Sequence, residues 1–422
     1  MWTRLLDRML AHIVQVGTLR LTLPDGSIRR YGAGTPQVGL IVKNPDLPRR
    51  VVLNPSLAVG ECYMEGGLEI EGDDLDGFFR LMIPNINATT APWFQRPLNL
   101  TRRGARRFRQ FAPVGKAQTN VARHYDLSSA LYDLFLDDDR QYSCGYFERK
   151  GMSLEAAQQA KKHHIAAKLR IEPGMRVLDI GCGWGGMGLT LARDYGAEVV
   201  GVTLSKEQHT MAVERVRAAG LEGRVDVRLV DYRKLHERFD RIVSVGMFEH
   251  VGVPHYNEYF SFVNDALERD GLALIHTIGH VGPANEADPW ITRYIFPGGY
   301  APALNEMQKA IDRQQLVTCD IEALRLHYAY TLRAWYDRFM ANEARARVLF
   351  DERFVRMWRW YLKSMEASFS VGSLLVYQVQ LGKHLDAAPI TRDYLYRGNA
   401  SLAAAQQVGG PDQALHPAAS SL

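Results

Sequence analysis

The sequence predicts an α/β fold of the Rossmann-like type, with a mostly parallel sheet, a helical lid and a small N-terminal α+β domain. Three patterns support this prediction. A strand, a glycine-rich turn and a helix follow one another directly over residues 176–195. Strand-like and helical patterns then alternate to residue 277, which is typical of a parallel sheet with right-handed crossovers. Short β-like runs between residues 17 and 77 indicate a separate small domain.

The small domain is expected over residues 1–90. Residues 1–18 have apolar side chains at helical spacing, and Leu19–Leu23 alternates apolar and polar residues before a Pro-Asp-Gly-Ser turn. Further strands are predicted at Val38–Val42 and Arg50–Leu53, and a helix at Leu75–Met82. Because no catalytic set is recognisable here, membrane attachment or self-association is the expected role of this domain.

Residues 91–118 are the expected linker, and they mix basic with aromatic side chains. Such a mixture can place cations on lipid phosphates, where each basic residue near an anionic bilayer contributes about 1 kcal/mol. An ordinary solvated linker is the alternative. Nucleic acid is disfavoured as a partner because no nucleic-acid motif accompanies the patch. The patch comprises Arg96, Arg102, Arg103, Arg106, Arg107, Arg109 and Lys116 with Trp93, Phe94, Phe108 and Phe111.

Residues 119–398 are expected to form the catalytic domain. Two helices, one after Asn120 and one at Leu154–Leu169, precede the first strand and are predicted to cover the cofactor as a lid. Long helices with an aromatic stripe, expected to be core, follow Arg293. Residues 399–422 are expected to be a disordered tail. The alternating strands and helices between lid and stripe are Glu198–Val202, Lys206–Ala219, Val225–Val230, Arg241–Val245, Tyr256–Leu267 and Leu272–Thr277.

Composition describes a globular protein. The chain has 422 residues, 46% of them hydrophobic and 23% charged, which is enough for two cores of ordinary size. Neither an apolar run long enough to span a membrane nor a signal-peptide pattern is recognised, so a cytoplasmic enzyme is expected, at most peripheral to the inner face of the membrane. The four cysteines form no C-x-x-C pair, so neither a disulfide framework nor a metal site is indicated.

The glycine-rich turn, which begins at Asp179, is predicted to cradle a cofactor. Its glycines permit backbone conformations closed to other residues, so a ligand can lie against the main chain. Gly181-x-Gly183-x-x-Gly186 also fits a dinucleotide fingerprint, which would place a pyrophosphate at the helix N-terminus. Asp179 favours another ligand, because a carboxylate there can hold an amino-acid ammonium. We therefore expect S-adenosylmethionine (SAM), with a nicotinamide-dependent dehydrogenase as the alternative.

Chemically reactive side chains gather where the predicted strands end and in the predicted lid. Ligands of parallel sheets bind beyond the carboxyl ends of the strands, and His276 lies at the end of one predicted strand and Glu249 just past another. A lone buried His or Glu is more often a satisfied core group, so the clustering is what indicates an active site. The cluster comprises Cys144, Asp231, Tyr232, Glu249, His250, His276, Tyr328 and Tyr330.

Seven short motifs are spread in order over the predicted catalytic domain. They are Tyr142–Tyr146 (YSCGY), Leu178–Gly185 (LDIGCGWG), Gly201–Ser205 (GVTLS), Phe248–Gly252 (FEHVG), His276–Gly279 (HTIG), Tyr294–Pro297 (YIFP) and His327-Tyr328. Together these motifs resemble the cyclopropane-fatty-acyl-phospholipid synthases and their mycolic-acid relatives, over roughly residues 115–385. The resemblance implies a class I methyltransferase fold, SAM as the donor and a bilayer of unsaturated phospholipid as the partner.

The resemblance also implies the chemistry. These enzymes transfer a methylene from SAM to a cis double bond of an acyl chain: the alkene attacks the sulfonium methyl, a carbocation results, and a base removes a proton so that the ring closes. Family members use bound bicarbonate as that base. His276 and Tyr328 can donate to such an anion, and Glu249 can accept its O–H. By carry-over, the catalytic residues are Cys144, Glu249, His276, Ile278 through its main chain, and Tyr328.

The same resemblance, together with the argument for Asp179 above, gives ten residues that are expected to bind SAM. Most methyltransferases carry a carboxylate at the end of the second strand, whereas this chain has Val202-Thr203 there, and Gln208 is the expected substitute. The amino-acid end of SAM would contact Tyr142, Ser143, Asp179, Gly181 and Gly183, the ribose would contact Thr203, Leu204 and Gln208, and the adenine would contact Asp231 and Tyr232.

Two further hypotheses stay open at this point. A sister C-methyltransferase would methylate the same double bond without closing the ring, and the motifs barely separate it from a synthase. The other hypothesis is a non-catalytic membrane-binding protein that keeps the cofactor-binding fold. The presence of all four side chains Cys144, Glu249, His276 and Tyr328 argues against it. A homodimer is expected, and no nucleic-acid partner.

Overall fold

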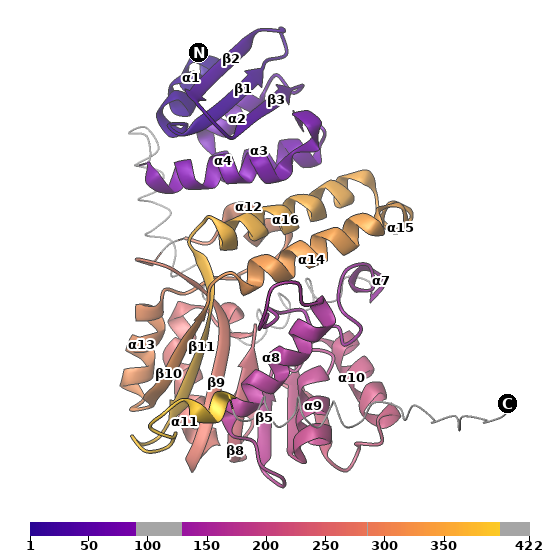
Figure 1. Cartoon of the computed structure of the whole chain (residues 1–422), viewed down its shortest axis with the longest axis vertical. Coiled ribbons are helices and arrows are strands. Elements are labelled where there is room, and N and C mark those ends of the chain that lie inside the picture. Colours follow the sequence, from indigo (N-terminus) through magenta and orange to yellow (C-terminus); the bar gives the residue numbers. More distant parts are fainter. Residues whose placement is uncertain (90–128, 285, 397–422) are drawn as a thin grey trace, which may run out of the picture.

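The computed structural model describes residues 1–89, 129–284 and 286–396. A small N-terminal unit lies above a larger α/β unit, and a layer of helices separates the two (Figure 1). The linker predicted at 91–118, the tail predicted at 399–422 and the start of the first lid helix lie outside the described residues.

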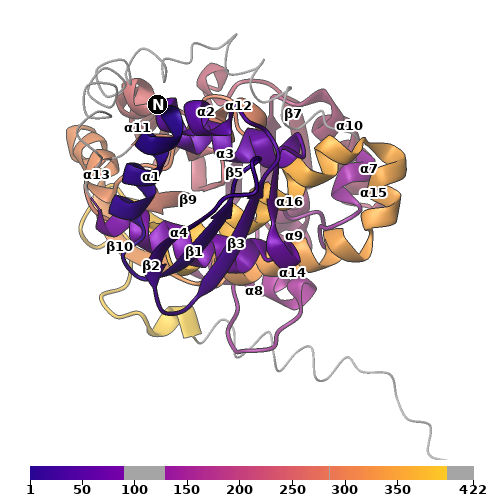
Figure 2. The same cartoon turned by 90° about the horizontal axis from the view of Figure 1, so that it is seen from above.

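Residues 1–89 combine a four-stranded sheet with helices. The strand order is β2-β1-β3-β4, in which β1 and β3 are parallel and the other two pairs are antiparallel. Figure 2 shows this sheet from above, over the rest of the molecule. The predicted α+β character is therefore confirmed. The elements are α1 (Trp2–Ile13), β1 (Gly17–Thr22), β2 (Ile28–Ala33), β3 (Gln37–Val42), α2 (Leu47–Leu53), α3 (Pro55–Met64), β4 (Leu68–Ile70), η1 (Glu71–Asp73) and α4 (Leu75–Ala88).

The strand predicted at Arg50–Leu53 is wrong, because α2 occupies these residues. Pro48 lies in the first turn of α2, where its fixed φ and missing N–H suit a helix start. Val51 and Val52 are buried on the face that packs toward the core. A window of four residues with two neighbouring valines is too short to separate a helical from a strand period.

The larger unit is built on a seven-stranded sheet of order β10-β11-β9-β8-β5-β6-β7. The pairs from β7 to β9 are parallel, and β11 is antiparallel to both of its neighbours, so the predicted mostly parallel sheet is confirmed. The sequence prediction missed β10 and β11 and ended the strand containing His276 too early. The strands are β5 (Arg176–Ile180), β6 (Glu198–Thr203), β7 (Val225–Leu229), β8 (Phe239–Val245), β9 (Leu267–His280), β10 (Val317–Leu324) and β11 (Leu374–Gly382).

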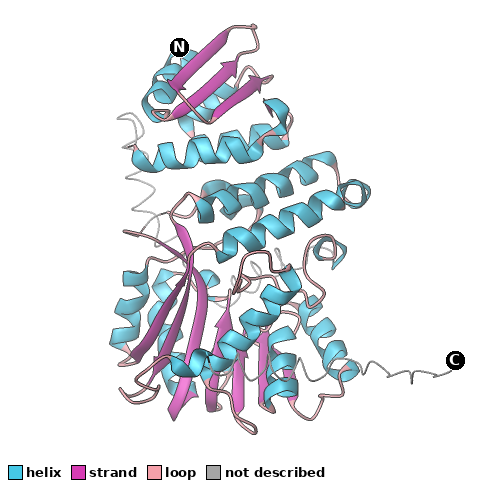
Figure 3. Ribbon diagram, in the orientation of Figure 1, coloured by secondary structure: helices cyan, strands magenta, loops and turns pink. Residues whose placement is uncertain are grey.

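Helices cover both faces of this sheet (Figure 3). Successive strand residues point to opposite faces, and Val177 and Leu178 of β5 accordingly belong to different apolar clusters. The cluster of Val177 includes side chains of α8 (Leu154–Leu169), α9 (Gly186–Tyr195) and α10 (Lys206–Ala218), and that of Leu178 includes α11 (Tyr256–Ala266) and α13 (Leu304–Arg313). Shorter elements are α7 (Ser129–Tyr132), η2 (Tyr232–Lys234), η3 (Phe248–His250), η4 (Val253–His255), α12 (Pro289–Tyr294) and α15 (Glu343–Leu349).

The helical lid differs from the prediction. α14 (His327–Ala341) and α16 (Glu352–Ser370) form the layer between the sheet and helices α3 and α4 (Figure 1). α8, predicted to belong to the lid, instead packs on the sheet because its Ile165, Ala166 and Leu169 are fully buried against strand residues. The expectation that the aromatic stripe of α16 is core is confirmed for Trp358 and Tyr361, which are both buried, whereas Phe354 and Met365 of the same stripe are partly exposed.

Trp360 joins the N-terminal unit to the helical layer. Its ring lies 5.1 Å from that of Tyr63, 5.6 Å from that of Phe78 and 4.7 Å from that of Phe79, measured between centroids. Edge-to-face and tilted aromatic pairs of this kind add stability beyond their buried area. The N-terminal unit is therefore fastened to α16 by an aromatic cluster.

Within the described ranges, no helix is both long and apolar enough to cross a membrane.

Candidate active site

The glycine-rich turn joins the end of β5 to the start of α9. Gly181, Gly183 and Gly185 all have positive φ, of 82°, 55° and 81°, which explains why glycine stands at each position. A Cβ added at Gly183 would meet no protein atom within 4 Å, so this part of the turn faces open space. The main chain can therefore be approached closely by a ligand.

Asp179 lies just before this turn, near the end of β5. Its side chain is buried, and Oδ2 has no hydrogen-bond partner among the described residues. Burial raises the pKa of Asp179 to about 7, although the nearby charge of Lys161 opposes the shift. A buried carboxylate oxygen without a donor is costly, so this group is arranged to receive one from a ligand.

All ten residues expected at the cofactor line one cavity beside the glycine-rich turn. Within it, Thr203 Oγ1 donates to Gln208 Oε1 at 2.9 Å, so the two side chains form one polar unit. The Asp231 carboxylate accepts from Arg233 Nε at 2.9 Å and from Nη2 at 2.8 Å. Arg233 also lines the cavity and was missed, because the sequence does not indicate which way its side chain turns. The ten are Tyr142, Ser143, Asp179, Gly181, Gly183, Thr203, Leu204, Gln208, Asp231 and Tyr232.

A second cavity, of about 720 Å³, adjoins the first. The two share part of their lining, namely Tyr142, Ser143, Gly246 and His250. All five residues expected to be catalytic line the second cavity: Cys144, Glu249, His276, Ile278 and Tyr328. The structure therefore brings the two predicted sets of residues to neighbouring spaces with a common wall.

Glu249 lies on η3, directly after β8. Its Oε1 accepts the main-chain N–H of Ile278 at 2.7 Å, and its Oε2 has no partner among the described residues. Burial raises the pKa of Glu249 to about 7, and the Ile278 hydrogen bond opposes this shift. The Ile278 N–H is therefore engaged by Glu249, and the expected main-chain contact of Ile278 with an anion stays a prediction.

His276 lies within β9, four residues before its end, and not at a strand terminus as predicted. Its Nδ1 is 3.1 Å from Nε2 of Gln378, which lies directly opposite on β11. Burial holds the pKa of His276 well below its usual range, so the ring is neutral at pH 7. In the orientation that the structure gives the Gln378 amide, its Nε2 donates to Nδ1, which places the ring proton of His276 on Nε2.

Cys144 is a buried thiol. Its Sγ lies 3.3 Å from the carbonyl oxygen of Gly145, and burial raises the thiol pKa well above its usual range. The thiolate is the reactive form of cysteine, so this side chain is a weak nucleophile at neutral pH. It lines the cavity next to Tyr142 and Ser143 without competing for an electrophile.

The N-terminal unit supplies an apolar wall of the second cavity. Side chains of α1, α2 and α4 line it together with Trp290, Trp360 and Met365 from the larger unit. Sequence reasoning gave these N-terminal residues no place in the site, because the contact joins segments more than 200 residues apart. The N-terminal lining includes Met9, Leu10, Ile13, Val51, Phe78, Phe79, Met82, Ile83 and Ile86.

The fold and the position of the glycine-rich turn define the class, a class I SAM-dependent methyltransferase. Residues 114–379 match the family described as mycolic acid cyclopropane synthetase, and the chain belongs to that family. Residues 5–85 match a family described only as a domain of unknown function.

Relatives of known name extend this assignment. The cyclopropane-fatty-acyl-phospholipid synthase of Escherichia coli (strain K12) is 40% identical over 354 residues, which are 84% of this chain and 90% of that protein. The probable fatty acid methyltransferase of Pseudomonas putida is 38% identical over 392 residues, 90% of this chain and 96% of that protein. A solved structure that is similar is the crystal structure of mycolic acid cyclopropane synthase CmaA1 complexed with SAH (S-adenosylhomocysteine) and CTAB. Its sequence is 34% identical, and the match covers 64% of this chain and 99% of that chain with a TM-score of 0.60. These similarities support SAM-dependent cyclopropane fatty acid synthesis as the general function.

Proposed function

We propose that this enzyme closes a cyclopropane ring on the cis double bond of unsaturated phospholipid acyl chains, using SAM as the methylene source. The observation that carries this proposal is the pair of adjoining cavities. One lies beside the glycine-rich turn, and the other is large, mainly apolar and has Glu249 and His276 in its lining. An apolar cavity of about 720 Å³ suits part of an acyl chain better than a small polar substrate.

The first cavity fits SAM. The unpartnered Oδ2 of Asp179 suits the ammonium of an amino acid, and the open space over Gly183 accepts a ligand against the main chain. Gln208 and Thr203 would hold the ribose hydroxyls, and Asp231, fixed by Arg233, would face the adenine. Bound there, SAM supplies an electrophilic methyl group on a positively charged sulfur.

The polar end of the second cavity fits bicarbonate. His276 Nε2–H would donate to the anion, and Glu249 Oε2, buried without a protein partner among the described residues, would accept its O–H. Tyr328 lines the same cavity. Bound there, bicarbonate would supply the base that takes the proton from the new methyl group.

The protein's remaining task in this proposal is to protect a carbocation on the acyl chain. Mainly apolar side chains of α1, α4 and α16 line the cavity, and the protonated Cys144 adds no strong nucleophile. Rings of Tyr142 and Phe296 line the cavity and can present their negative faces to a cation. A neutral His276 serves better than an imidazolium here, because a positive charge would repel the carbocation.

The product identifies the reaction. Purified protein is incubated with SAM and vesicles of a mono-unsaturated phospholipid, and the lipids are examined by mass spectrometry and proton NMR. We expect the mass of one CH2 to be gained and high-field ring protons to appear. The same mass gain with vinyl or branched-methyl signals would make the enzyme a C-methyltransferase that does not close the ring, which is the second candidate. No mass gain would contradict both.

We also propose that the enzyme acts at a bilayer and binds it through the basic and aromatic residues predicted in the linker. Replacing Arg102, Arg103, Arg106 and Arg107 by Ser is expected to weaken attachment to phosphatidylglycerol vesicles by at least about tenfold, or about 1.4 kcal/mol, and to flatten its salt dependence. Co-sedimentation at low and moderate salt measures both effects.

The expected homodimer stays a prediction.

A matched control makes the same change of charge elsewhere. Four exposed arginines lie near the amino-terminal edge of the sheet, at the edge remote from the two cavities, and their replacement by Ser should leave vesicle binding nearly unchanged. Equal losses in both variants would mean that only net charge matters, and would contradict a specific attachment surface. The control residues are Arg193, Arg217, Arg224 and Arg238.

A further inference from the structure

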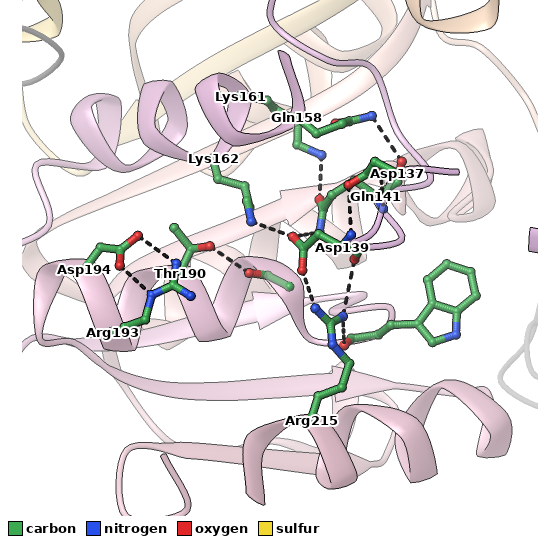
Figure 4. Close-up of polar contacts among 12 residues, drawn as sticks. Asp137, Asp139, Gln141, Gln158, Lys161, Lys162, Thr190, Arg193, Asp194 and Arg215 are labelled. Atoms are coloured by element: carbon green, nitrogen blue, oxygen red, sulfur yellow. Dashed lines mark hydrogen bonds and ion pairs between the residues drawn. The ribbon is translucent and has the colours of Figure 1, made fainter. Parts of the chain in front are cut away.

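A buried ammonium lies behind the segment that separates the two cavities. Lys161, on α8, has no exposed surface, and its Nζ donates to Gln141 Oε1 at 2.6 Å and to Ser143 Oγ at 2.7 Å. Figure 4 shows Lys161 and Gln158 of α8 reaching this segment. Because Ser143 lines both cavities, a single lysine is in contact with the common wall.

The backbone of this segment is held without Lys161. Gln158 Nε2 donates to the carbonyl oxygens of Gln141 at 3.1 Å and of Ser143 at 2.9 Å. Lys162 pairs with Asp139 at 2.5 Å, and Arg215 pairs with Asp139 and donates to the carbonyl oxygen of Trp184 at 2.7 Å (Figure 4). The distinctive contributions of Lys161 are therefore its hydrogen bonds to two side chains and its charge.

The charge of Lys161 acts on the cofactor cavity. It is the nearby charge that opposes the raised pKa of Asp179, and it also disfavours a charged His276. Burial lowers the pKa of Lys161 to about 8, although the charges of Asp137 and Asp139 oppose this shift, so the ammonium persists at pH 7. The titratable groups that interact with it are Lys162 of the same helix, Asp137, Asp139 and Cys144 of the facing segment, Asp179 of β5 and His276 of β9.

We propose that Lys161 is a positioning residue for SAM: its ammonium orients Ser143 and Gln141 at the common wall and favours the ionised form of the Asp179 carboxylate, which receives the amino group of the cofactor. The inference rests on the cofactor binding included in the proposed function and is independent of the lipid reaction. An uncharged side chain at this position would leave Asp179 in an apolar surrounding without its compensating cation.

The test is calorimetric titration of the full chain with S-adenosylhomocysteine (SAH) between pH 6 and pH 8.5. In the wild type, affinity should rise through about pH 7 as Asp179 ionises. We call the part of the curve in which SAH affinity rises with pH the acid limb. Lys161→Gln keeps a hydrogen-bond donor and removes the charge, so the acid limb should move to higher pH. For each pH unit of this shift, SAH affinity at pH 6.5 should fall by about tenfold. Lys161→Arg should keep the limb in place, and Asp179→Asn should abolish it.

The control is Lys162→Gln, which removes the neighbouring ammonium but leaves Asp139 paired with Arg215, so the limb should not move. Unchanged SAH affinity of Lys161→Gln with an unmoved limb would overturn the proposal, because neither Ser143 nor Asp179 would then depend on the ammonium. Weaker binding with an unmoved limb would overturn the action on Asp179 and leave only the contact with Ser143 and Gln141. If Lys161→Gln does not fold, Lys161→Met removes the donor as well as the charge, and the same shift of the limb to higher pH is expected. Absence of SAH binding by the wild type would instead contradict the proposed function, which keeps the two failures distinct.

Discussion

Glu249→Gln is expected to lower kcat by about 100- to 10,000-fold, the range associated with loss of a positioned acid–base group, while leaving SAH affinity nearly intact. Gln keeps the oxygen that accepts the Ile278 N–H and replaces the unpartnered Oε2 by an amide nitrogen. That nitrogen is a donor and cannot accept the O–H of the proposed base. Turnover by methyl transfer and SAH binding by calorimetry are the two measurements, and near-normal turnover would remove Glu249 from the mechanism.

The same variant should gain stability at alkaline pH. Folding raises the pKa of Glu249 from 4.5 to about 7, so the carboxyl group contributes stability below pH 4.5 that is lost as the pH rises through 7. At pH 8 the buried charge costs about 3 kcal/mol, and Glu249→Gln should recover much of it in urea unfolding. Equal free energies of unfolding for wild type and variant at pH 8 would show that the buried charge of Glu249 does not destabilise the folded protein.

Glu322→Gln is the matched control for this effect and should have the opposite sign. Although burial opposes the shift, the hydrogen bond from His164 and the charge of Lys168 lower the pKa of Glu322 to about 2. Its contribution to stability is present above pH 4.5 and is lost as the pH falls through 2. At pH 8 this control should therefore destabilise the protein. The comparison separates a carboxylate whose buried charge destabilises the fold from one whose ion pair stabilises it.

The parts of the fold that sequence reasoning predicted well are those with local signals. The strand, turn and helix around Gly181–Gly186 carry their own pattern, and alternation of elements implies a parallel sheet without knowledge of any distant contact. Because strand ends meet at one edge of such a sheet, Asp179, Thr203 and Asp231 could be expected in one cavity. The family resemblance selected individual residues beyond that.

Features that depend on contacts between distant parts of the chain could not be predicted from the sequence. β11 pairs with β9 across about 100 residues, and both of its faces are buried, so its apolar run carries no clear alternation to mark it. The bond between Glu249 and the Ile278 N–H depends on how η3 meets β9. The apolar wall from α1 and α4 depends on the docking of Trp360.

Gly183→Val is expected to weaken SAH binding by at least about a hundredfold, which corresponds to about 2.8 kcal/mol. The space above Gly183 is free of protein atoms within 4 Å of an added Cβ, so the valine would occupy room that the cofactor needs. Calorimetric titration with SAH measures the loss. The substitution also places a β-branched residue at a φ of 55°, so some stability will be lost by strain.

Gly220→Val separates strain from steric exclusion. Gly220 follows α10, is exposed, has a φ of 65° and likewise has no atom within 4 Å of an added Cβ, yet it lies outside both cavities. Its replacement should cost similar stability in urea unfolding and leave the SAH dissociation constant unchanged. If Gly183→Val also left that constant unchanged, the turn would not be the cradle of the cofactor. If both variants bound SAH equally poorly, strain and not exclusion would be the cause.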